Sequence, residues 1–242
     1  YDVPNKLFSL NELNSIDLFQ DDKSCNNRNI NNIFIFQNKS PKDIYTVGDS
    51  LLKNLYGIAE ASSEYDFNYF HYTSNNCLFI FEYKFKNWHC PFSDKSELDE
   101  YFSNIKNSVI IYGGRFPFHI EQSGFDNTFV KEAKTYGKNN NINPNEILNT
   151  LEVFLENKNT VVIIYPIPEQ AWIVSDLFLE KKFSWKQNVS YPQEVWEKRK
   201  SSSYELLNKI QHKNLIRIYP DEIFCDSFLP GECVSKFEDS LF

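Results

Sequence analysis

The stretch IYTVGDSLL, residues 44–52, decides the fold of this sequence. It begins with a short apolar run, Ile44–Val47, passes through the letters GDS, and leads into a segment with helical spacing, Leu51–Ala59. An apolar run that turn residues end at once is typical of a strand buried on both faces of a parallel sheet. Gly48 permits a tight turn. The stretch therefore predicts a strand, a turn and a helix in immediate succession.

Three further apolar runs end in the same way, and they are Val109–Tyr112, Val161–Tyr165 and Leu215–Tyr219. Between the four runs lie polar stretches with helical spacing, such as Glu146–Glu156 and Tyr204–Ile210. Strands that alternate with helices predict an α/β fold with a mostly parallel, doubly wound sheet. Open sheets of this kind place their sites beyond the carboxyl ends of the strands. The turn residues after these runs are therefore the first place to look for function.

Length and charge limit the classes of protein that fit. The 242 residues suit one domain, and the formal net charge of -8 argues against a nucleic-acid partner. No apolar run reaches the roughly 20 residues that span a bilayer. The sequence has no signal peptide and no Met, so we expect a segment of a longer chain whose targeting information lies elsewhere. We interpret residues 1–40 as a lead-in packed on the domain edge and residues 41–242 as the functional domain.

The cysteines predict disulfides and not a metal site. They are Cys25, Cys77, Cys90, Cys225 and Cys233. None forms a C-x-x-C pair, so we expect no zinc and no other metal. The turn Pro230-Gly231 would bring Cys225 and Cys233 together, and we also expect a bond between Cys77 and Cys90, with Cys25 single. Two disulfides imply an oxidising compartment. The alternative is that the thiols are free and buried in a cytosolic protein.

Ser50 is the candidate nucleophile. It stands between the first strand and the following helix, where free backbone N–H groups and the helix dipole would stabilise an oxyanion. The alternative is that Ser50 only caps the helix, a role that needs nothing but a helix start. The motif is not the G-x-S-x-G elbow of α/β-hydrolases, because Asp49 precedes the serine and Leu52 replaces the last glycine.

Four stretches, taken together, resemble a known group of proteins. They are VGDSLL (47–52), IIYGGRFPFHIEQSGFDN (110–127), VVIIYPIPEQAW (161–172) and RIYPDEIFCDSFLPGEC (217–233). They resemble the SGNH (GDSL-like) hydrolase superfamily, and more narrowly the SGNH domain attached to bacterial acyltransferase-3 membrane proteins. The resemblance runs from about residue 40 to the end of the sequence. It implies a three-layer, flavodoxin-like α/β/α sandwich.

The resemblance implies a serine-dependent O-acyltransferase, usually an O-acetyltransferase, that modifies an extracytoplasmic polysaccharide or other glycan without a cofactor. A membrane acyltransferase domain would deliver the acyl donor. The domain would then be periplasmic, tethered to the inner membrane through a segment outside these residues. Two alternatives stay open: a carbohydrate esterase with the same fold, and a carbohydrate-binding relative that has lost its catalytic triad.

The same resemblance assigns the remaining site residues. Gly114 and Arg115 stand where the superfamily carries Gly-x-Asn, so they would stabilise the oxyanion, or Arg115 would clamp an acidic substrate group. The alternative for Arg115 is a pairing with Glu121 or Asp126 that braces the loop. The expected substrate-binding residues are Asp49, Asn75 and Trp172. The Asp49 carboxylate would also brace the turn, Asn75 or Ser74 would offer an N–H, and Trp172 would wall the pocket.

The catalytic base has no counterpart in the sequence. Members of the superfamily use a histidine in an Asp-x-x-His motif near their C-terminus, and this sequence stops at FEDSLF before such a motif. The histidines are His71, His89, His119 and His212, and none has that context. His119 lies nearest to the expected site, but we expect it to pack or bind locally. The triad is therefore incomplete within residues 1–242.

Overall fold

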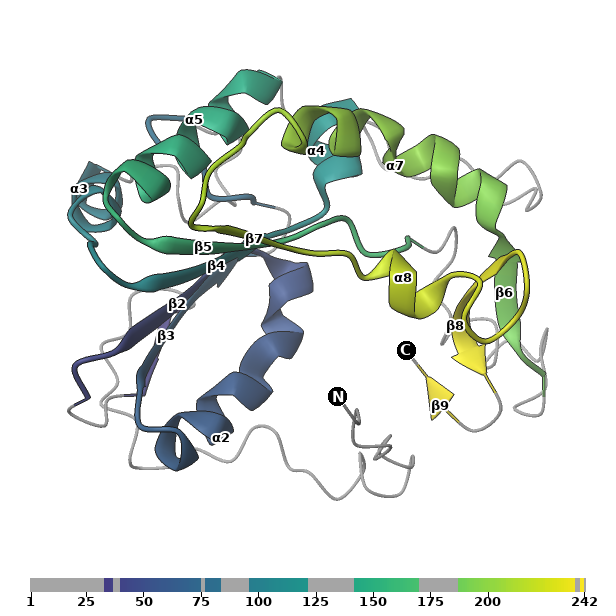
Figure 1. Ribbon diagram of the computed structural model, residues 1–242, viewed down its shortest axis with the longest axis horizontal. Coiled ribbons are helices and arrows are strands. Elements are labelled where there is room, and N and C mark those ends of the chain that lie inside the picture. Colours follow the sequence, from purple (N-terminus) through teal and green to yellow (C-terminus); the bar gives the residue numbers. More distant parts are fainter. Residues whose placement is uncertain are drawn as a thin grey trace.

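The computed structural model describes residues 33–36, 40–74, 77–83, 96–121, 142–169, 187–237 and 240–241. Its main feature is a six-stranded sheet in the order β1-β3-β2-β4-β5-β7 (Figure 1). The strands are β1 (Ile33–Phe36), β2 (Asp43–Asp49), β3 (Asn68–Ser74), β4 (Val109–Gly113), β5 (Thr160–Ile164) and β7 (Leu215–Ile218). Only β1 runs antiparallel to its neighbour. The predicted α/β class and doubly wound sheet are confirmed.

Helices cover both faces of this sheet, as in a three-layer sandwich. In Figure 1, η1 and α2 lie on one face, and α4, α5 and α7 lie on the other. The helices are η1 (Ser50–Tyr56), α2 (Gly57–Glu64), α3 (Ser96–Ser103), α4 (Phe116–Glu121), α5 (Pro144–Glu156), α7 (Gln193–Leu207) and α8 (Asp221–Phe224). The fold therefore places the core between the sheet and its two helical layers.

The helix α5 shows how the sequence sets its own boundaries. Asn143 caps it by accepting a hydrogen bond from the N–H of Asn145, and Pro144 occupies its first position, where a missing N–H costs nothing. Its buried residues recur with helical spacing and face the core; they are Ile147, Thr150, Leu151, Phe154 and Leu155.

Two other helices differ from the segments expected from the sequence. The segment after Ser50 is a 3₁₀ helix that continues as α2, and α7 ends at Leu207.

The strand β3 is buried along its whole length although it carries several polar side chains. On one face its polar groups bond to one another in a chain. The hydroxyl of Tyr69 contacts Thr46 Oγ1 of β2 at 2.8 Å and Nδ1 of His71 at 2.9 Å. Nε2 of His71 lies 2.9 Å from Oγ1 of Thr73. These contacts satisfy polar groups that would otherwise be costly to bury.

His71 predicts a loss of stability in acid. Burial, with a smaller contribution from Lys53, lowers the pKa of His71 from 6.5 to about 4. Only the unfolded chain binds this proton in that window, so stability is full above pH 6.5 and falls as the pH drops towards 4. We expect the free energy of unfolding to lose about 3 kcal/mol across the window. Urea titrations of the wild type and of His71→Gln should show a steeper loss for the wild type, and parallel curves would contradict this assignment.

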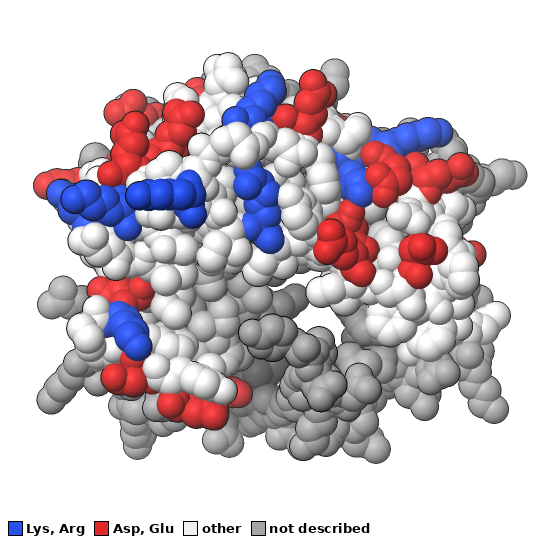
Figure 2. Space-filling view, in the orientation of Figure 1, with Lys and Arg blue, Asp and Glu red and all other residues white. Residues whose placement is uncertain are grey.

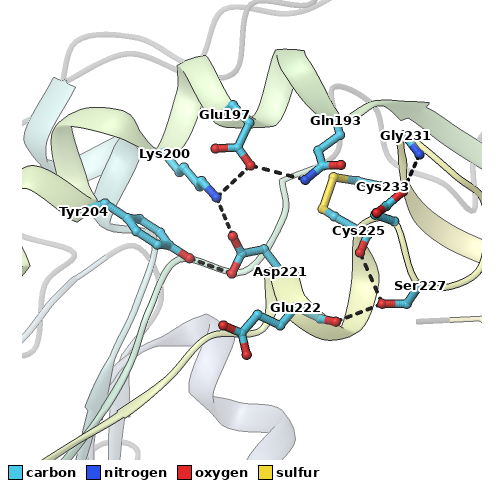
Figure 3. The surroundings of a disulfide bond; sticks show 11 residues. Gln193, Glu197, Lys200, Tyr204, Asp221, Glu222, Cys225, Ser227, Gly231 and Cys233 are labelled. Carbon is cyan, nitrogen blue, oxygen red and sulfur yellow. Dashed lines mark hydrogen bonds and ion pairs between the residues drawn. A yellow bond between two sulfur atoms is a disulfide. The ribbon is translucent and has the colours of Figure 1, made fainter.

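A second, three-stranded sheet lies beyond α7 and was not predicted from the sequence. It consists of β6 (Val189–Pro192), β8 (Glu232–Phe237) and β9 (Ser240–Leu241), all antiparallel. The disulfide predicted between Cys225 and Cys233 is present and ties the end of α8 to β8 (Figure 3). Cys77 is also disulfide-bonded. Cys90 and Cys25 lie outside the described residues, so the predicted pairing of Cys77 with Cys90 stays a prediction.

The surface of the described residues carries charges of both signs. On the face in Figure 2, acidic and basic side chains are interspersed. No helix in the described ranges is long and apolar enough to cross a membrane.

Candidate active site

Two strand ends meet at the carboxyl edge of the sheet. β2 and β4 are parallel neighbours, and Gly48 lies opposite Gly113 in their register. The chain runs from β2 to β3 on one side of β2 and then crosses to β4 on the other. The switch point of the sheet therefore lies between β2 and β4, where such folds bind their ligands. Ser50 and Gly114-Arg115 therefore follow two adjacent strands.

The Asp49 carboxylate joins these two strand ends. Asp49 is completely buried. Its Oδ1 accepts a hydrogen bond from the N–H of Leu51 at 2.9 Å, and its Oδ2 accepts one from the N–H of Arg115 at 2.7 Å. Nε2 of His119 is the third donor, 3.0 Å from Oδ2. This geometry favours the bracing role of Asp49 over contact with a substrate.

Gly114 is required by the close approach of Asp49. A Cβ atom on Gly114 would lie 2.8 Å from both Cγ and Oδ2 of the Asp49 side chain, a distance that real Cβ atoms do not show. Any larger residue would push the carboxylate away from the N–H of Arg115. The glycine therefore allows the contact that holds the two loops together.

Ser50 is the first residue of η1, and its side chain is partly exposed. The capping role considered for it belongs to Asp49, which is the N-cap and accepts from the N–H of Leu51. The Ser50 hydroxyl makes no hydrogen bond within the described part of the chain. Within the described residues, the hydroxyl of Ser50 is therefore not used to cap η1.

Arg115 is held by a buried carboxylate that the sequence analysis did not single out. Its Nε donates to Oε1 of Glu169 at 2.9 Å, and its guanidinium lies over the ring of Phe118, 5.1 Å from the centroid. The pairing considered with Glu121 is wrong, because Glu121 accepts instead from Arg199 at 2.7 Å. Asp126, the other partner considered, lies outside the described residues.

His119 lies in α4 and is buried beneath Asp49. Because the carboxylate can only accept, Nε2 carries the proton, and this tautomer is inferred from the contact. Its Nδ1 is buried and has no hydrogen-bond partner among the described residues. This local contact is the role that we expected for His119 in place of catalysis.

The remaining predicted positions are only partly covered by the structure. Asn75, Trp172 and Cys90 lie outside the described residues, and Ser74 ends β3 as a buried residue. The roles predicted for Ser50, Gly114 and Arg115 stay predictions. Within the described ranges, no cluster of three or more His, Cys, Asp or Glu side chains could hold a metal ion.

A cavity of about 530 Å³ lies at the opposite end of the sheet from these residues. It is open and largely polar, and Asp43, Tyr45, Tyr101 and Ser108 are among its lining residues. Asp43 and Ser108 stand at the amino ends of β2 and β4. The cavity is therefore separate from the switch point, and we assign the candidate active site to the carboxyl edge.

No curated protein matches the sequence. The chain is similar to the periplasmic domain of a lipopolysaccharide acetyltransferase from Salmonella ser. Paratyphi A, with 14% identity and a TM-score of 0.46 over 82% of this chain and 72% of that one. The sequence matches the family described as the SGNH domain fused to AT3 domains over residues 17–237, nearly its whole length. The chain therefore belongs to the family of SGNH domains that are fused to AT3 domains.

Proposed function

We propose that this domain transfers a short acyl group to a hydroxyl of an extracytoplasmic glycan through an acyl-Ser50 intermediate. The acyl group that we propose is acetyl. Membership of a family fused to AT3 domains supports acyl transfer. The observation that carries the serine mechanism is the position of Ser50. Asp49 caps η1, and the Ser50 hydroxyl, which has no hydrogen bond among the described residues, follows β2 at the switch point, next to the strand that leads into Gly114 and Arg115.

The proposed chemistry has two steps. Oγ of Ser50 attacks the carbonyl carbon of the acyl donor, and collapse of the tetrahedral intermediate expels the donor alcohol or thiol with a proton. A glycan hydroxyl then attacks the acyl-Ser50 ester and regenerates the serine. Hydrolysis would differ only in that water replaces the glycan hydroxyl in the second step.

The oxyanion of each step needs donors at the edge where β2 and β4 end. We assign this role to the backbone N–H groups of Ser50 and Gly114 and to the guanidinium of Arg115. The backbone N–H of Arg115 is already engaged by Asp49, so Arg115 would act through its side chain. An arginine with only its Nε engaged keeps its terminal nitrogens as donors.

The proton from Ser50 requires a base. Among the described histidines, His119 donates to Asp49 and His71 lies in the polar chain of β3. Neither stands in an Asp-x-x-His context. As the family resemblance implies, we assign the base to a histidine in an Asp-x-x-His motif, which residues 1–242 do not contain. Every experiment is therefore designed for the full-length protein. The same proposal has three further parts. The domain lies outside the cytoplasm, an AT3 domain supplies the acyl group, and the reaction needs no cofactor.

A fluorophosphonate tests the proposal because it reacts with activated serines. Mass spectrometry of the labelled full-length protein should find the phosphonate on Ser50. The exposed Ser201 of α7 provides a matched control, since its hydroxyl bonds only to the carbonyl of Lys198 within the same helix. Ser201→Ala should label like the wild type, whereas Ser50→Ala should not label. A label on another serine, or none on a protein that still transfers acetyl groups, would overturn the serine mechanism.

A further inference from the structure

A chain of buried charges leads from the candidate site into the protein. Glu169 follows β5 in the loop that begins with Tyr165-Pro166, and its side chain is 5% exposed. It accepts two hydrogen bonds of 2.9 Å, from Nε of Arg115 and from Nε of Arg199. Arg199 belongs to α7 and is also buried. Three separate segments of the fold therefore meet at one carboxylate.

The two ends of this chain differ in exposure. The Arg199 side chain is 7% exposed and is bound a second time, by Glu121 of α4. Ser202 of α7 in turn donates to the other oxygen of Glu121 at 2.6 Å. The Arg115 side chain is 22% exposed and has no other ion pair or hydrogen bond within the described ranges. Arg199, the buried end, thus anchors the network. Arg115, which follows β4 at the switch point, has the guanidinium nitrogens that bind no other described residue.

The two arginines and two glutamates of this network balance in charge, since Arg199 is shared between Glu169 and Glu121. Charge balance by itself does not set the direction of the partly exposed Arg115 guanidinium. The contact with Glu169 fixes Arg115 through Nε, and Cζ of Arg115 lies over the ring of Phe118. A planar guanidinium restrained at Nε and on one face can present its terminal nitrogens in only a narrow range of directions. Reactive geometry depends on such restraint, since small displacements of a donor weaken the stabilisation it gives.

We propose that Glu169 is a positioning residue that aims the guanidinium of Arg115 at the oxyanion formed on Ser50. Arg199 anchors Glu169 and does not contact the reacting atoms. The proposal rests on the function proposed above, because it presumes that Arg115 stabilises the oxyanion. It predicts that Glu169 matters for turnover only while Arg115 is present.

The test is a double-mutant cycle in the full-length protein, with hydrolysis of p-nitrophenyl acetate as the surrogate reaction. We expect Arg115→Ala to lower kcat about a hundredfold and Glu169→Gln to lower it roughly tenfold with a smaller change in KM. The double variant should be as active as Arg115→Ala alone, because Glu169 has nothing left to position. If Glu169→Gln does not fold, Glu169→Asp takes its place. It keeps the negative charge that Arg199 needs, but its side chain is one methylene too short to hold both arginines, so kcat should fall by the same factor.

Asp221 of α8 supplies a matched control, because its two partners lie on α7, the helix that also carries Arg199. It too is a buried carboxylate with two donors, Lys200 and Tyr204 of α7, each at 2.6 Å (Figure 3). Asp221→Asn should lower the melting temperature and leave kcat of the folded protein unchanged. A loss of kcat as large as that of Glu169→Gln would show that any damage to the buried charges of α7 acts on turnover, and would overturn the inference.

The outcomes separate the inference from the function on which it rests. If Arg115→Ala lowers kcat and both Glu169 variants turn over normally, the positioning role is overturned and the proposed function stands. If Glu169→Gln lowers kcat equally in the presence and absence of Arg115, Glu169 acts in another way and the inference again fails. If Arg115→Ala turns over like the wild type, the role proposed for Arg115 in the reaction fails.

Discussion

Ser50→Ala should lower acyl transfer by the full-length protein about 10⁴-fold or more while the protein remains folded. Without the hydroxyl no acyl-enzyme can form, and the remaining donors can stabilise only a direct attack by the acceptor. Ser50 is partly exposed and its hydroxyl has no hydrogen bond within the described residues, so its removal breaks no described contact. The measurements are turnover of p-nitrophenyl acetate and the melting temperature of the purified variant.

The variant Ser50→Cys is a second test of the nucleophilic role of Ser50. A thiolate can attack an ester in place of an alkoxide, so this variant should become sensitive to iodoacetamide and form a thioester with the surrogate substrate. Turnover by Ser50→Ala at the wild-type rate, at an unchanged melting temperature, would refute the nucleophilic role and favour a domain that only binds carbohydrate.

Gly48→Ala should destabilise the domain by about 4 kcal/mol or more. The added Cβ would lie 2.0 Å from the carbonyl oxygen of Gly113 and 2.8 Å from Cδ1 of Leu52. The first of these atoms belongs to the backbone of β4, so it can move only if β2 and β4 separate. Because these strands are central to the sheet, we expect most of the protein to be insoluble or unfolded at 37 °C. Urea denaturation of any soluble fraction measures the effect.

Gly57 is the matched control for this substitution. It has helical backbone angles at the junction of η1 and α2, and an added Cβ would meet nothing within 4 Å. Gly57→Ala should therefore leave stability unchanged or raise it by about 0.4–1 kcal/mol. Equal stability of the Gly48 and Gly57 variants would show that β2 and β4 are not packed as closely as described.

Much of the sheet could be predicted because four of its strands are continuous apolar runs that turn residues end. The runs at Ile44, Val109, Val161 and Leu215 became β2, β4, β5 and β7 with boundaries close to those expected. The strand β3 was missed because NYFHYTS shows neither an apolar run nor a regular alternation. Its burial depends on hydrogen bonds among side chains that are distant or two residues apart, and periodicity does not reveal such bonds.

Only part of the candidate site could be predicted from the sequence. The adjacency of the loops that carry Ser50 and Arg115 could be predicted, because strand ends that neighbour each other in a parallel sheet present their loops side by side. The partner of Arg115 could not be predicted, because Glu169 follows a different strand and Arg199, which also binds Glu169, lies 30 residues further along the sequence. The one signal available was position, because Glu169 follows the end of a predicted strand. The brace considered as an alternative was a pairing with Glu121 or Asp126, but Glu121 binds Arg199 instead.

The adjacency of Arg199 and Lys200 in α7 restricts how this helix can change during evolution. Arg199 pairs with Glu169 in the loop after β5, and Lys200 pairs with Asp221 of α8. An inserted or deleted residue in the first half of α7 would rotate both cations by about 100° relative to these two carboxylates. Both pairs would be lost together, whereas substitutions on the exposed side of α7 would leave them intact. In this lineage α7 should therefore tolerate wide drift in its outward residues while its number of residues between β6 and Arg199 stays constant.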